Sequence, residues 1–355
     1  MFMEKIAKQL TAVRPCVAEL TEYTVPEIAD DEVLIKVDYA APKHGTELAE
    51  FRETNPNIYE LFDDEWKLFF PREEKSESYL ARNVGNQYVG HIIEIGNKVN
   101  EYAVGDVVTS YGGIREYHIA KGQDNYRLRK LPPGMPWQNA LYYDPAQFAL
   151  GGVRDAHVRP GDYVAVFGLG AIGLIAVQMC KKYGASYVAA IDPIERRRKI
   201  AAQYGADAVF DPIKEDVGYM LKAQTGKLGV DAIIETSGSP HAMQSALRGL
   251  AHGGTLAFVA CGTEIRGGLN FGKEAHYNYG KIVFSRASSD PGPDYPRWDR
   301  RRIEETCWTM LSNGDLDCRE MIYPVVSLSE SAEAYMKYLD KEPDLSIKMA
   351  VDFNI

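Results

Sequence analysis

A glycine-rich turn near the middle of the chain constrains the fold more than any other feature. Gly168, Gly170 and Gly173 form a G-x-G-x-x-G pattern between a strand-like run, YVAVF, and a helix-like run, AIGLIAVQMCKKYG. In such a unit the first glycine permits a tight turn, the second lets backbone approach a pyrophosphate, and the third allows close helix–strand packing. The pattern predicts a dinucleotide site at the helix start, where Ala171 and Ile172 supply backbone N–H groups.

The same alternation of apolar strands and amphipathic helices continues from residue 160 to residue 285. It predicts a parallel sheet with helices on both faces, which is a doubly wound α/β fold. The first third of the chain carries short β-branched runs separated by Gly, Pro, Asn or Asp, and these predict a β-rich domain. At 355 residues the chain is long enough for two domains.

Composition restricts the partners of the chain. Lys and Arg number 40 against 50 Asp and Glu, a formal net charge of −10, which disfavours nucleic acid as a partner. No run approaches the ~18 apolar residues of a membrane helix, and the first residues lack a signal-peptide pattern. Five scattered cysteines fit reduced thiols. We expect a cytoplasmic protein that binds neither nucleic acid nor membranes.

One carboxylate predicts which dinucleotide binds. Asp192 ends the next apolar strand, about 20 residues beyond the glycine turn. A carboxylate there accepts hydrogen bonds from the adenosine ribose and repels a 2′-phosphate, which favours NAD over NADP. Arg197 follows closely and would weaken this preference by pairing with the phosphate or by stacking on adenine.

The order of these parts resembles the medium-chain dehydrogenase/reductase superfamily, in particular its polyol and sugar dehydrogenase branch. The resemblance covers nearly the full length and rests on GTELAEF, GNQYVGHIIEIGNKVNEYAVGDVV, YYDPAQFALGGVRDAHVRPGDYVAVFGLGAIG, AAIDPIERRRKIAAQYGAD and SIKMAV. It implies a GroES-like β-barrel catalytic domain over residues 1–150, completed by residues 290–355, and a Rossmann domain over residues 151–289. It also implies a homodimer or homotetramer.

The chain departs from this family where zinc-dependent members bind their catalytic metal. The family's Cys-Gly-Ser/Thr reads H-G-T at residues 44–46, its G-H-E reads G-N-Q at residues 85–87, and its E-P reads D-P at residues 144–145. Of the four ligand positions only His44 and Asp144 hold ordinary zinc ligands, because neutral amides are poor ones. The four close cysteines of the family's structural zinc lobe are missing too. We therefore predict that the chain holds no metal.

A site without zinc needs a side chain that accepts the alcohol proton as the hydride leaves. His44 fits best on the ordinary pKa of imidazole, with Asp144 as its orienting partner or as an alternative base. Lys43 can play this part if burial lowers its pKa. Thr46 matches the family hydroxyl that relays the proton or contacts the nicotinamide ribose. The alternative is a polar cluster that remains after metal loss.

Further positions are expected to contact substrate or cofactor. Asn86, Gln87 and Tyr143, near the lost metal positions, are predicted substrate contacts. Strand ends lie where open α/β sheets bind ligands, and two later basic residues match cofactor contacts in similar proteins. The predicted cofactor contacts beyond the glycine turn and residues 192 and 197 are Thr236, Ser237, Val259, Cys261, Arg286 and Lys348. For the last of these a solvated surface lysine is an equal alternative.

These observations together predict an NAD-dependent alcohol dehydrogenase without catalytic zinc. It would transfer a hydride between nicotinamide and a secondary alcohol or ketone of a sugar, cyclitol or polyol. One alternative is a zinc-free quinone or enone reductase, against which Asp192 counts because similar reductases usually prefer NADPH. Another is a non-catalytic nucleotide-binding protein, against which the retained Thr46 counts. The segment over residues 48–84 mixes aromatics with carboxylates and fits a lid, an oligomer contact or a surface loop equally well.

Overall fold

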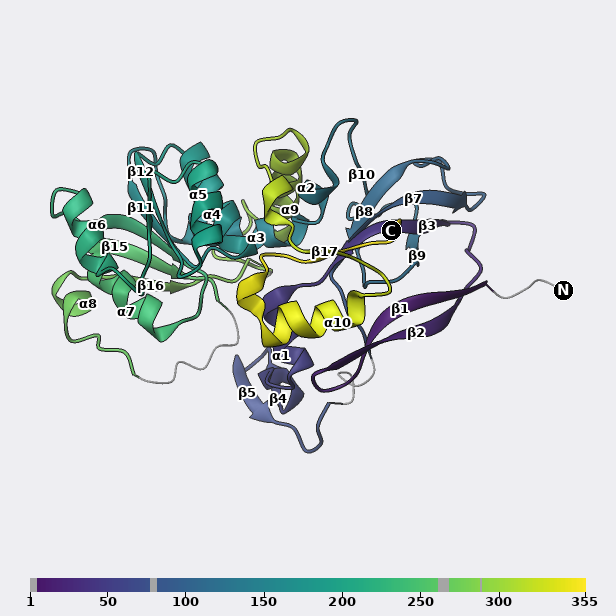
Figure 1. The fold of residues 1–355 in the computed structure, drawn as a ribbon, viewed down its shortest axis with the longest axis horizontal. Coiled ribbons are helices and arrows are strands. Elements are labelled where there is room, and N and C mark those ends of the chain that lie inside the picture. The colour runs from purple at the N-terminus through teal and green to yellow at the C-terminus, as the bar shows by residue number, and fades with distance from the viewer. Residues whose placement is uncertain (1–4, 77–81, 261–267, 288) are drawn as a thin grey trace. The chain divides into compact units, whose positions relative to one another are not determined.

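The computed structural model describes residues 5–76, 82–260, 268–287 and 289–355, and the chain forms two compact units (Figure 1). The first unit comprises Met1–Leu141 and Ile322–Ile355, and the second comprises Tyr142–Met321. The second unit thus includes residues 142–150 and 290–321, which the sequence-based boundaries assign to the catalytic domain. No helix among the described residues has the length and apolarity needed to cross a membrane.

The second unit is built on a six-stranded parallel sheet with the spatial order β13-β12-β11-β14-β15-β16. These strands are β11 (Tyr163–Phe167), β12 (Tyr187–Ile191), β13 (Ala208–Phe210), β14 (Val230–Glu235), β15 (Leu250–Phe258) and β16 (Lys281–Phe284). The order reverses between β11 and β14, as it does in dinucleotide-binding folds. The predicted doubly wound sheet is confirmed.

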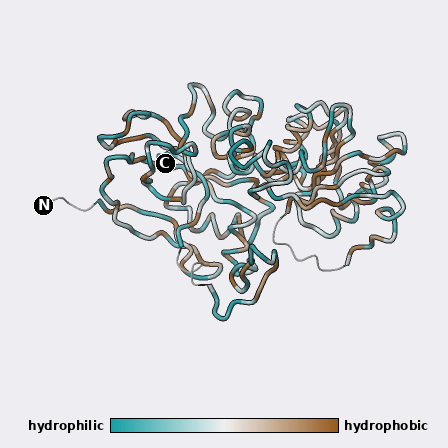
Figure 2. The backbone as a smooth tube through the Cα atoms, turned by 180° about the vertical axis from the view of Figure 1, so that it is seen from behind, coloured by the Kyte–Doolittle hydropathy of each residue, from teal (hydrophilic) through white to brown (hydrophobic). Residues whose placement is uncertain are grey.

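The strands of this sheet are apolar because both of their faces are covered by helices. Ala165 and Phe167 of β11 share a core with side chains of α6 and α7, while Val164 and Val166 point to the opposite face and are equally buried. Figure 2 shows the hydrophobic colour concentrated along these strands. The helices are α3 (Tyr143–Asp155), α4 (Ala171–Lys182), α5 (Glu195–Gln203), α6 (Val217–Gln224), α7 (Pro240–Gly249), α8 (Glu274–Tyr277) and α9 (Arg300–Ser312).

The first unit is a β structure in which the end of the chain completes the sheet. Its larger sheet has the order β10-β8-β7-β3-β18-β17, with β9 also paired to β3, and its smaller sheet has the order β2-β1-β6. The larger sheet contains β3 (Glu32–Ala41), β7 (Gln87–Ile95), β8 (Val107–Tyr111), β9 (Tyr117–Lys121), β10 (Arg129–Lys130), β17 (Val325–Ser327) and β18 (Ala350–Asp352). The smaller contains β1 (Lys5–Arg14), β2 (Val17–Val25) and β6 (Arg82–Asn83). Because β18 pairs antiparallel with β3, the C-terminal segment belongs to the N-terminal core.

Helices of the first unit flank this sheet. They are α1 (His44–Phe51), α2 (Trp137–Ala140) and α10 (Ser331–Tyr335), and a π-helical turn, Met336–Lys341, continues the last of them. This turn lies beside α1, where Arg52 Nε donates to Asp340 Oδ1 over 2.6 Å (Figure 1). The contact links two segments from opposite ends of the chain.

The segment after α1 forms a small exposed hairpin of β4 (Glu60–Asp63) and β5 (Leu68–Pro71). Its turn is closed by Asp63, whose Oδ1 accepts from the backbone N–H groups of Glu65 and Trp66. The hairpin exposes several large apolar side chains, which are Tyr59, Leu61, Trp66, Leu68, Phe69 and Phe70. A lid, an oligomer contact and a surface loop remain the three alternative predictions for this segment.

Candidate active site

The glycine turn has the geometry that a pyrophosphate site requires. Gly168 follows β11 with a φ of +84°, which favours glycine, and α4 begins at Ala171 with Gly170 as its N-cap. A Cβ placed on Gly170 would meet open space, whereas a Cβ on Gly173 would lie 1.8 Å from the Gly168 carbonyl oxygen. The turn is therefore packed against the helix on one side and open on the other, and it fits a dinucleotide phosphate.

Asp192 follows β12 and lies directly against this turn. It is 3% exposed, and its Oδ2 accepts from the Leu169 N–H while its Oδ1 accepts from the Ile194 N–H, both over 2.8 Å. Arg197 Nη1 lies 3.7 Å from Asp192 Oδ2. A carboxylate has about four acceptor positions, so Asp192 retains capacity for ribose hydroxyls. The carboxylate that would repel a 2′-phosphate and the guanidinium that would attract it therefore lie next to each other.

The polar residues after β14 support the turn. The Thr236 hydroxyl donates to the Gly168 carbonyl over 2.8 Å, so Thr236 braces the glycine turn from within the unit. The Ser237 N–H donates to Glu235 Oε1 over 2.9 Å, and the Ser237 hydroxyl donates to the same oxygen. Glu235 ends β14 fully buried, and burial raises its pKa. We did not predict Glu235, although a carboxylate at the end of an otherwise apolar strand is a usable signal.

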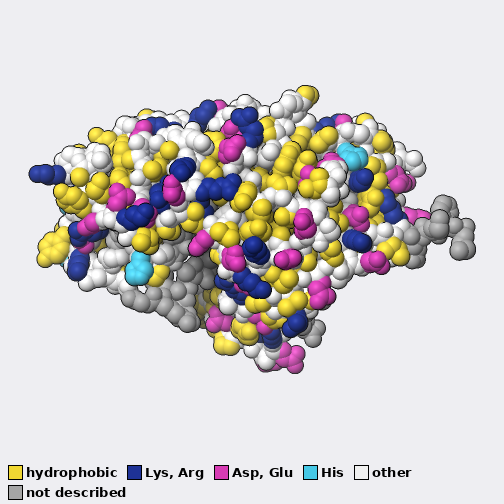
Figure 3. Space-filling model, viewed as in Figure 1, with side chains coloured by type: hydrophobic (Ala, Val, Ile, Leu, Met, Phe, Trp, Pro, Cys, Tyr) yellow, Lys and Arg dark blue, Asp and Glu magenta, His cyan; other side chains and the backbone are white. Residues whose placement is uncertain are grey.

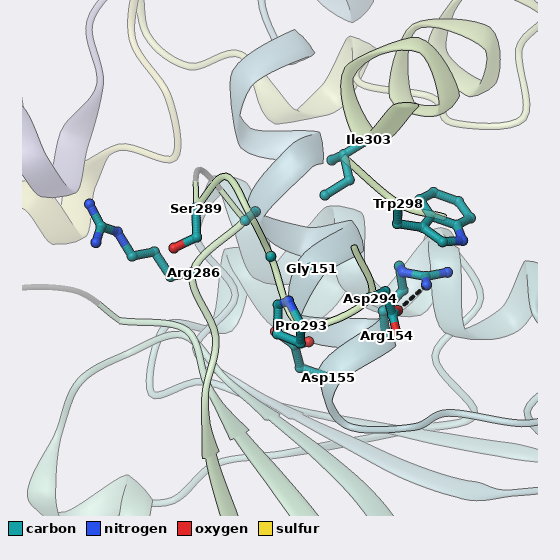
Figure 4. A pocket seen from close by; sticks show the side chains of 11 residues that line it. Gly151, Arg154, Asp155, Arg286, Ser289, Pro293, Asp294, Trp298 and Ile303 are labelled. Atoms are coloured by element: carbon teal, nitrogen blue, oxygen red, sulfur yellow. Dashed lines mark hydrogen bonds and ion pairs between the residues drawn. The ribbon is translucent and has the colours of Figure 1, made fainter. Parts of the chain in front are cut away.

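The remaining cofactor candidates of this unit lie around the ends of β15 and β16. Val259 is buried, and its N–H donates to the Glu235 carbonyl over 2.8 Å. Cys261 lies outside the described residues. Arg286 follows β16, is exposed, and extends away from the other labelled residues in Figure 4.

Arg286 borders a shallow pocket between α3 and the segment that leads into α9 (Figure 4). The wall of this pocket is held by Arg154 of α3, which pairs with Asp294 and lies 3.7 Å from the centroid of the Trp298 ring. The Arg302 guanidinium lies 4.3 Å from the same ring. A cation is attracted to the face of an indole ring. The contacts of Arg154 and Arg302 with Trp298 therefore hold the segment before α9 on α3.

Tyr143 and Asp144 occupy the first turn of α3, in the second unit. Tyr143 is fully buried, and its hydroxyl lies 3.4 Å from Oε2 of the buried Glu304, which pairs with Arg300 of α9 over 3.0 Å. Asp144 is buried as well. Because His44 belongs to the first unit, the pairing of His44 with Asp144 stays a prediction.

A second pocket lies in the first unit at the start of α1. Its lining is strongly polar and includes three of the predicted residues. The lining residues are Lys43, Thr46, Glu47, Glu50, Arg82, Asn83, Val84, Gly85 and Asn86. Of the other two candidates in this part of the unit, His44 is the half-buried first residue of α1, and Gln87 is the fully buried first residue of β7. The pocket therefore brings together the start of α1 and the loop before β7, which carry two of the altered metal motifs.

Glu47 and Lys348 are buried charged side chains whose hydrogen bonds join segments around this pocket. Burial raises the pKa of Glu47, against the opposing effect of the Tyr335 hydroxyl. The charge of Lys348 also favours the ionised form of Glu47. Lys348 itself is 1% exposed, and its ammonium donates to the Pro42 carbonyl over 2.7 Å, so it is not a solvated surface lysine. The contact between Lys348 and the cofactor pyrophosphate remains a prediction.

Zinc does not fit the residues present. Asn86 and Gln87 are carboxamides, and only His44 and Asp144, from different units, are ordinary zinc ligands. The Asn86 Nδ2 is buried without a hydrogen-bond partner, so an N–H donor is available at that position. Within the described parts of the chain no three His, Cys, Asp or Glu side chains group in a way that could hold a metal ion.

Known proteins similar to this chain are dehydrogenases. A family model described as zinc-binding dehydrogenase matches residues 171–288. The D-guloside 3-dehydrogenase of Escherichia coli (strain K12) is 53% identical over 349 residues, 98% of this chain and 100% of the relative. A putative zinc-binding dehydrogenase of Sinorhizobium meliloti 1021, solved with NADP, has a TM-score of 0.74 at 18% identity, with 98% of this chain and all of that chain covered.

A further solved structure has the same fold. It is a short chain alcohol dehydrogenase of Escherichia coli CFT073 complexed with NADH, with a TM-score of 0.72 at 18% identity, covering 98% of this chain and 99% of that chain. The glycine turn, the six-stranded parallel sheet and the full-length match at 53% identity agree with one another. The chain is an oxidoreductase and belongs to the medium-chain dehydrogenase/reductase superfamily.

Proposed function

We propose that this chain is an NAD-dependent dehydrogenase that oxidises one secondary hydroxyl group of a sugar, glycoside or related polyol to a ketone, without catalytic zinc. The observation that carries the substrate class is the 53% identity to D-guloside 3-dehydrogenase over the full length of that relative. Ketone reduction is the same reaction in reverse. Small polyhydroxylated molecules are thus the proposed substrates.

The second unit supplies the cofactor contacts in this proposal. NAD, when bound, provides the nicotinamide ring that accepts the hydride. The open space at Gly170 and the N-terminus of α4 suit its pyrophosphate. Asp192, held against the turn by the Leu169 N–H, suits the ribose hydroxyls and disfavours a 2′-phosphate.

The first unit supplies the proton acceptor. We assign this role to His44, with Lys43 and Asp144 as the alternatives, because the hydroxyl must lose its proton as the carbon loses its hydride. The proton leaves the substrate oxygen for the base, the hydride leaves the carbon, and a ketone remains. Thr46, exposed in the same turn and lining the pocket, is positioned to relay that proton.

Neutral amides in the pocket favour a polyhydroxylated substrate. The Asn86 Nδ2 is a buried donor that lacks a partner in the structure, and a substrate hydroxyl would satisfy it. Gln87 and Tyr143 remain proposed substrate contacts. Charges on the face drawn in Figure 3 are intermixed rather than gathered by sign, which fits a small neutral substrate better than a polyanion.

A substrate screen tests this function. The purified protein is mixed with D-gulosides, other sugars, cyclitols and their keto forms, with NAD or NADP, while absorbance of the reduced nicotinamide is followed. We expect turnover of a sugar or glycoside with NAD. Turnover of quinones or enones with NADPH would favour the reductase alternative, and no turnover with any hydroxyl or carbonyl compound would favour a non-catalytic nucleotide-binding protein.

Two further properties belong to the proposal. We propose a homodimer or homotetramer, which light scattering of the purified protein would measure. We also propose a cytoplasmic location.

A further inference from the structure

A buried carboxylate in the pocket of the first unit joins three segments of the chain. Glu47, in the first turn of α1, is 6% exposed and lines that pocket. Its Oε1 accepts from the Tyr335 hydroxyl over 2.6 Å and from the Gly85 N–H over 3.1 Å. Its Oε2 accepts from the Lys43 N–H over 3.2 Å. One side chain thus holds a turn, a loop and a distant helix together.

These segments carry the proposed catalytic groups of the unit. Lys43 is the N-cap of α1 and precedes His44. Gly85 precedes Asn86 and Gln87, and a Cβ on Gly85 would lie 2.5 Å from the Ile114 backbone, so this loop is tightly packed. A carboxylate that accepts from both backbone N–H groups sets the spacing between the two loops.

The charged groups around Glu47 come from each element packed against it. Arg82 of β6 is paired with Glu50, and its charge also acts on Glu47. Lys348 approaches from the C-terminal segment, where it holds the Pro42 carbonyl. A buried carboxylate without donors would cost several kcal/mol, so this set of donors and cations keeps Glu47 in one place.

We propose that Glu47 is the positioning residue of the dehydrogenase site, and that Tyr335 fixes it from the C-terminal segment. The pair would hold the Lys43–Thr46 turn at one distance from the Gly85–Gln87 loop, so that proton acceptor and substrate contacts stay aligned. This inference rests on the proposed function and assigns roles to two residues that are not among the predicted site residues. Misplacement of a reacting group by about 1 Å can cost about 10²-fold in rate.

The test compares three variants once wild-type turnover of a sugar or glycoside has been measured. Glu47→Gln places an amide N–H₂ where a carboxylate accepts three hydrogen bonds, and Tyr335→Phe removes only the 2.6 Å donor. Asp340→Asn is the matched control, because it weakens another contact between α1 and the C-terminal segment that does not line the pocket. Folding of each variant is checked by circular dichroism and thermal melting.

We expect kcat to fall by roughly 10-fold to 10²-fold in Glu47→Gln, with KM for NAD within about twofold of wild type. In Tyr335→Phe kcat should fall less than in Glu47→Gln, because the Gly85 N–H still donates to Oε1, and KM for NAD should again stay within about twofold. The rise of kcat with pH that is assigned to His44 should remain in both variants. Asp340→Asn should lower the melting temperature alone.

Several outcomes would overturn this role. Folded Glu47→Gln and Tyr335→Phe with wild-type kcat would make Glu47 a purely structural residue. An equal loss of kcat in Asp340→Asn would assign the effect to general packing of α1. If Glu47→Gln does not fold, Tyr335→Phe decides by its kcat at unchanged KM for NAD. Absence of any wild-type turnover would instead contradict the proposed function.

Discussion

Asp192 is the side chain on which the choice of cofactor depends. Asp192→Ala should narrow the preference for NAD over NADP by roughly 10-fold to 10²-fold, because one like-charge contact of about 1–3 kcal/mol with the 2′-phosphate disappears. Arg197, 3.7 Å from Oδ2, would then be free to pair with that phosphate. The measurement is kcat/KM with each cofactor.

Asp192→Asn is the control for this change, because it keeps an acceptor for the Leu169 N–H or the Ile194 N–H. It should narrow the preference with less loss of NAD binding than the alanine variant. A wild-type preference for NADP would mean that Arg197 outweighs the carboxylate, and the NAD assignment would be wrong.

His44 is the residue on which the proton path is predicted to depend. His44→Ala should lower kcat by roughly 10²–10⁴, the usual contribution of a positioned general base. In the wild type, oxidation should rise with pH through the range near ~6.5 in which an ordinary imidazole loses its proton. Steady-state kinetics between pH 5 and 9 measure both effects.

Neighbouring variants separate the candidate bases. Lys43→Met should leave the pH profile in place if His44 is the base. Asp144→Asn should cost less than His44→Ala if Asp144 only orients the ring, and about as much if it is the base. Near-normal turnover and an unchanged profile in His44→Ala would make that residue a remnant of the lost metal site.

At the scale of elements, the β11–turn–α4 unit offers a matched pair of glycines. Gly170→Ala should fold normally, because its φ of −75° suits alanine and its Cβ meets open space, yet NAD should bind about 10-fold or more weakly. Gly173→Ala should destabilise the fold by about 1–3 kcal/mol or more, since its Cβ would lie 1.8 Å from a carbonyl oxygen. Calorimetric titration and urea unfolding measure the two effects. Wild-type NAD affinity in Gly170→Ala would place the pyrophosphate elsewhere.

The sheet of the first unit contains a half-buried histidine that makes stability depend on pH. His118 of β9 stacks on Tyr88 of β7 at 4.1 Å between ring centroids, and its Nε2 lies 2.9 Å from the Gly113 carbonyl oxygen. Burial lowers the pKa of His118 to about 4, below the ~6.5 of an unfolded chain. The unfolded state therefore binds the proton first, and stability is lost as pH falls from about 6.5 toward 4.

His118→Phe tests this dependence, because it keeps an aromatic ring on Tyr88 and removes the titrating group. The free energy of unfolding from urea titrations should fall less between pH 7 and pH 5 in the variant than in the wild type. Equal slopes would show that other groups cause the acid sensitivity.

At the scale of the whole molecule, the chain is predicted to work without stoichiometric zinc. Elemental analysis of the purified protein should find far less than one zinc per chain, and a chelator should leave turnover unchanged. The reason is the donor set, in which carboxamides replace two of the four ligands. Nearly one zinc per chain, lost together with activity on chelation, would contradict this and would make His44 and Asp144 the first ligands to test.

The sequence by itself determined the cofactor-binding unit, because its signals are local. The glycine turn, its flanking strand and helix, and Asp192 lie within about 30 residues, a distance over which chain geometry follows from residue type. The apolar strands likewise predicted a parallel sheet covered on both faces, which the structure confirms. The altered metal motifs were equally visible, since each is a short run of residues.

Only the tertiary structure decided how the pocket of the first unit is held. Tyr335 bonds to Glu47 across 288 positions, and Lys348 bonds to Pro42 across 306, so neither contact leaves a periodic or spaced pattern in the sequence. The packing of α9 on α3, which places residues 290–321 in the second unit, likewise joins segments that are far apart in the sequence. Local patterns report which element a residue belongs to, whereas a buried hydrogen bond depends on which elements meet, and this is settled only when the cores pack.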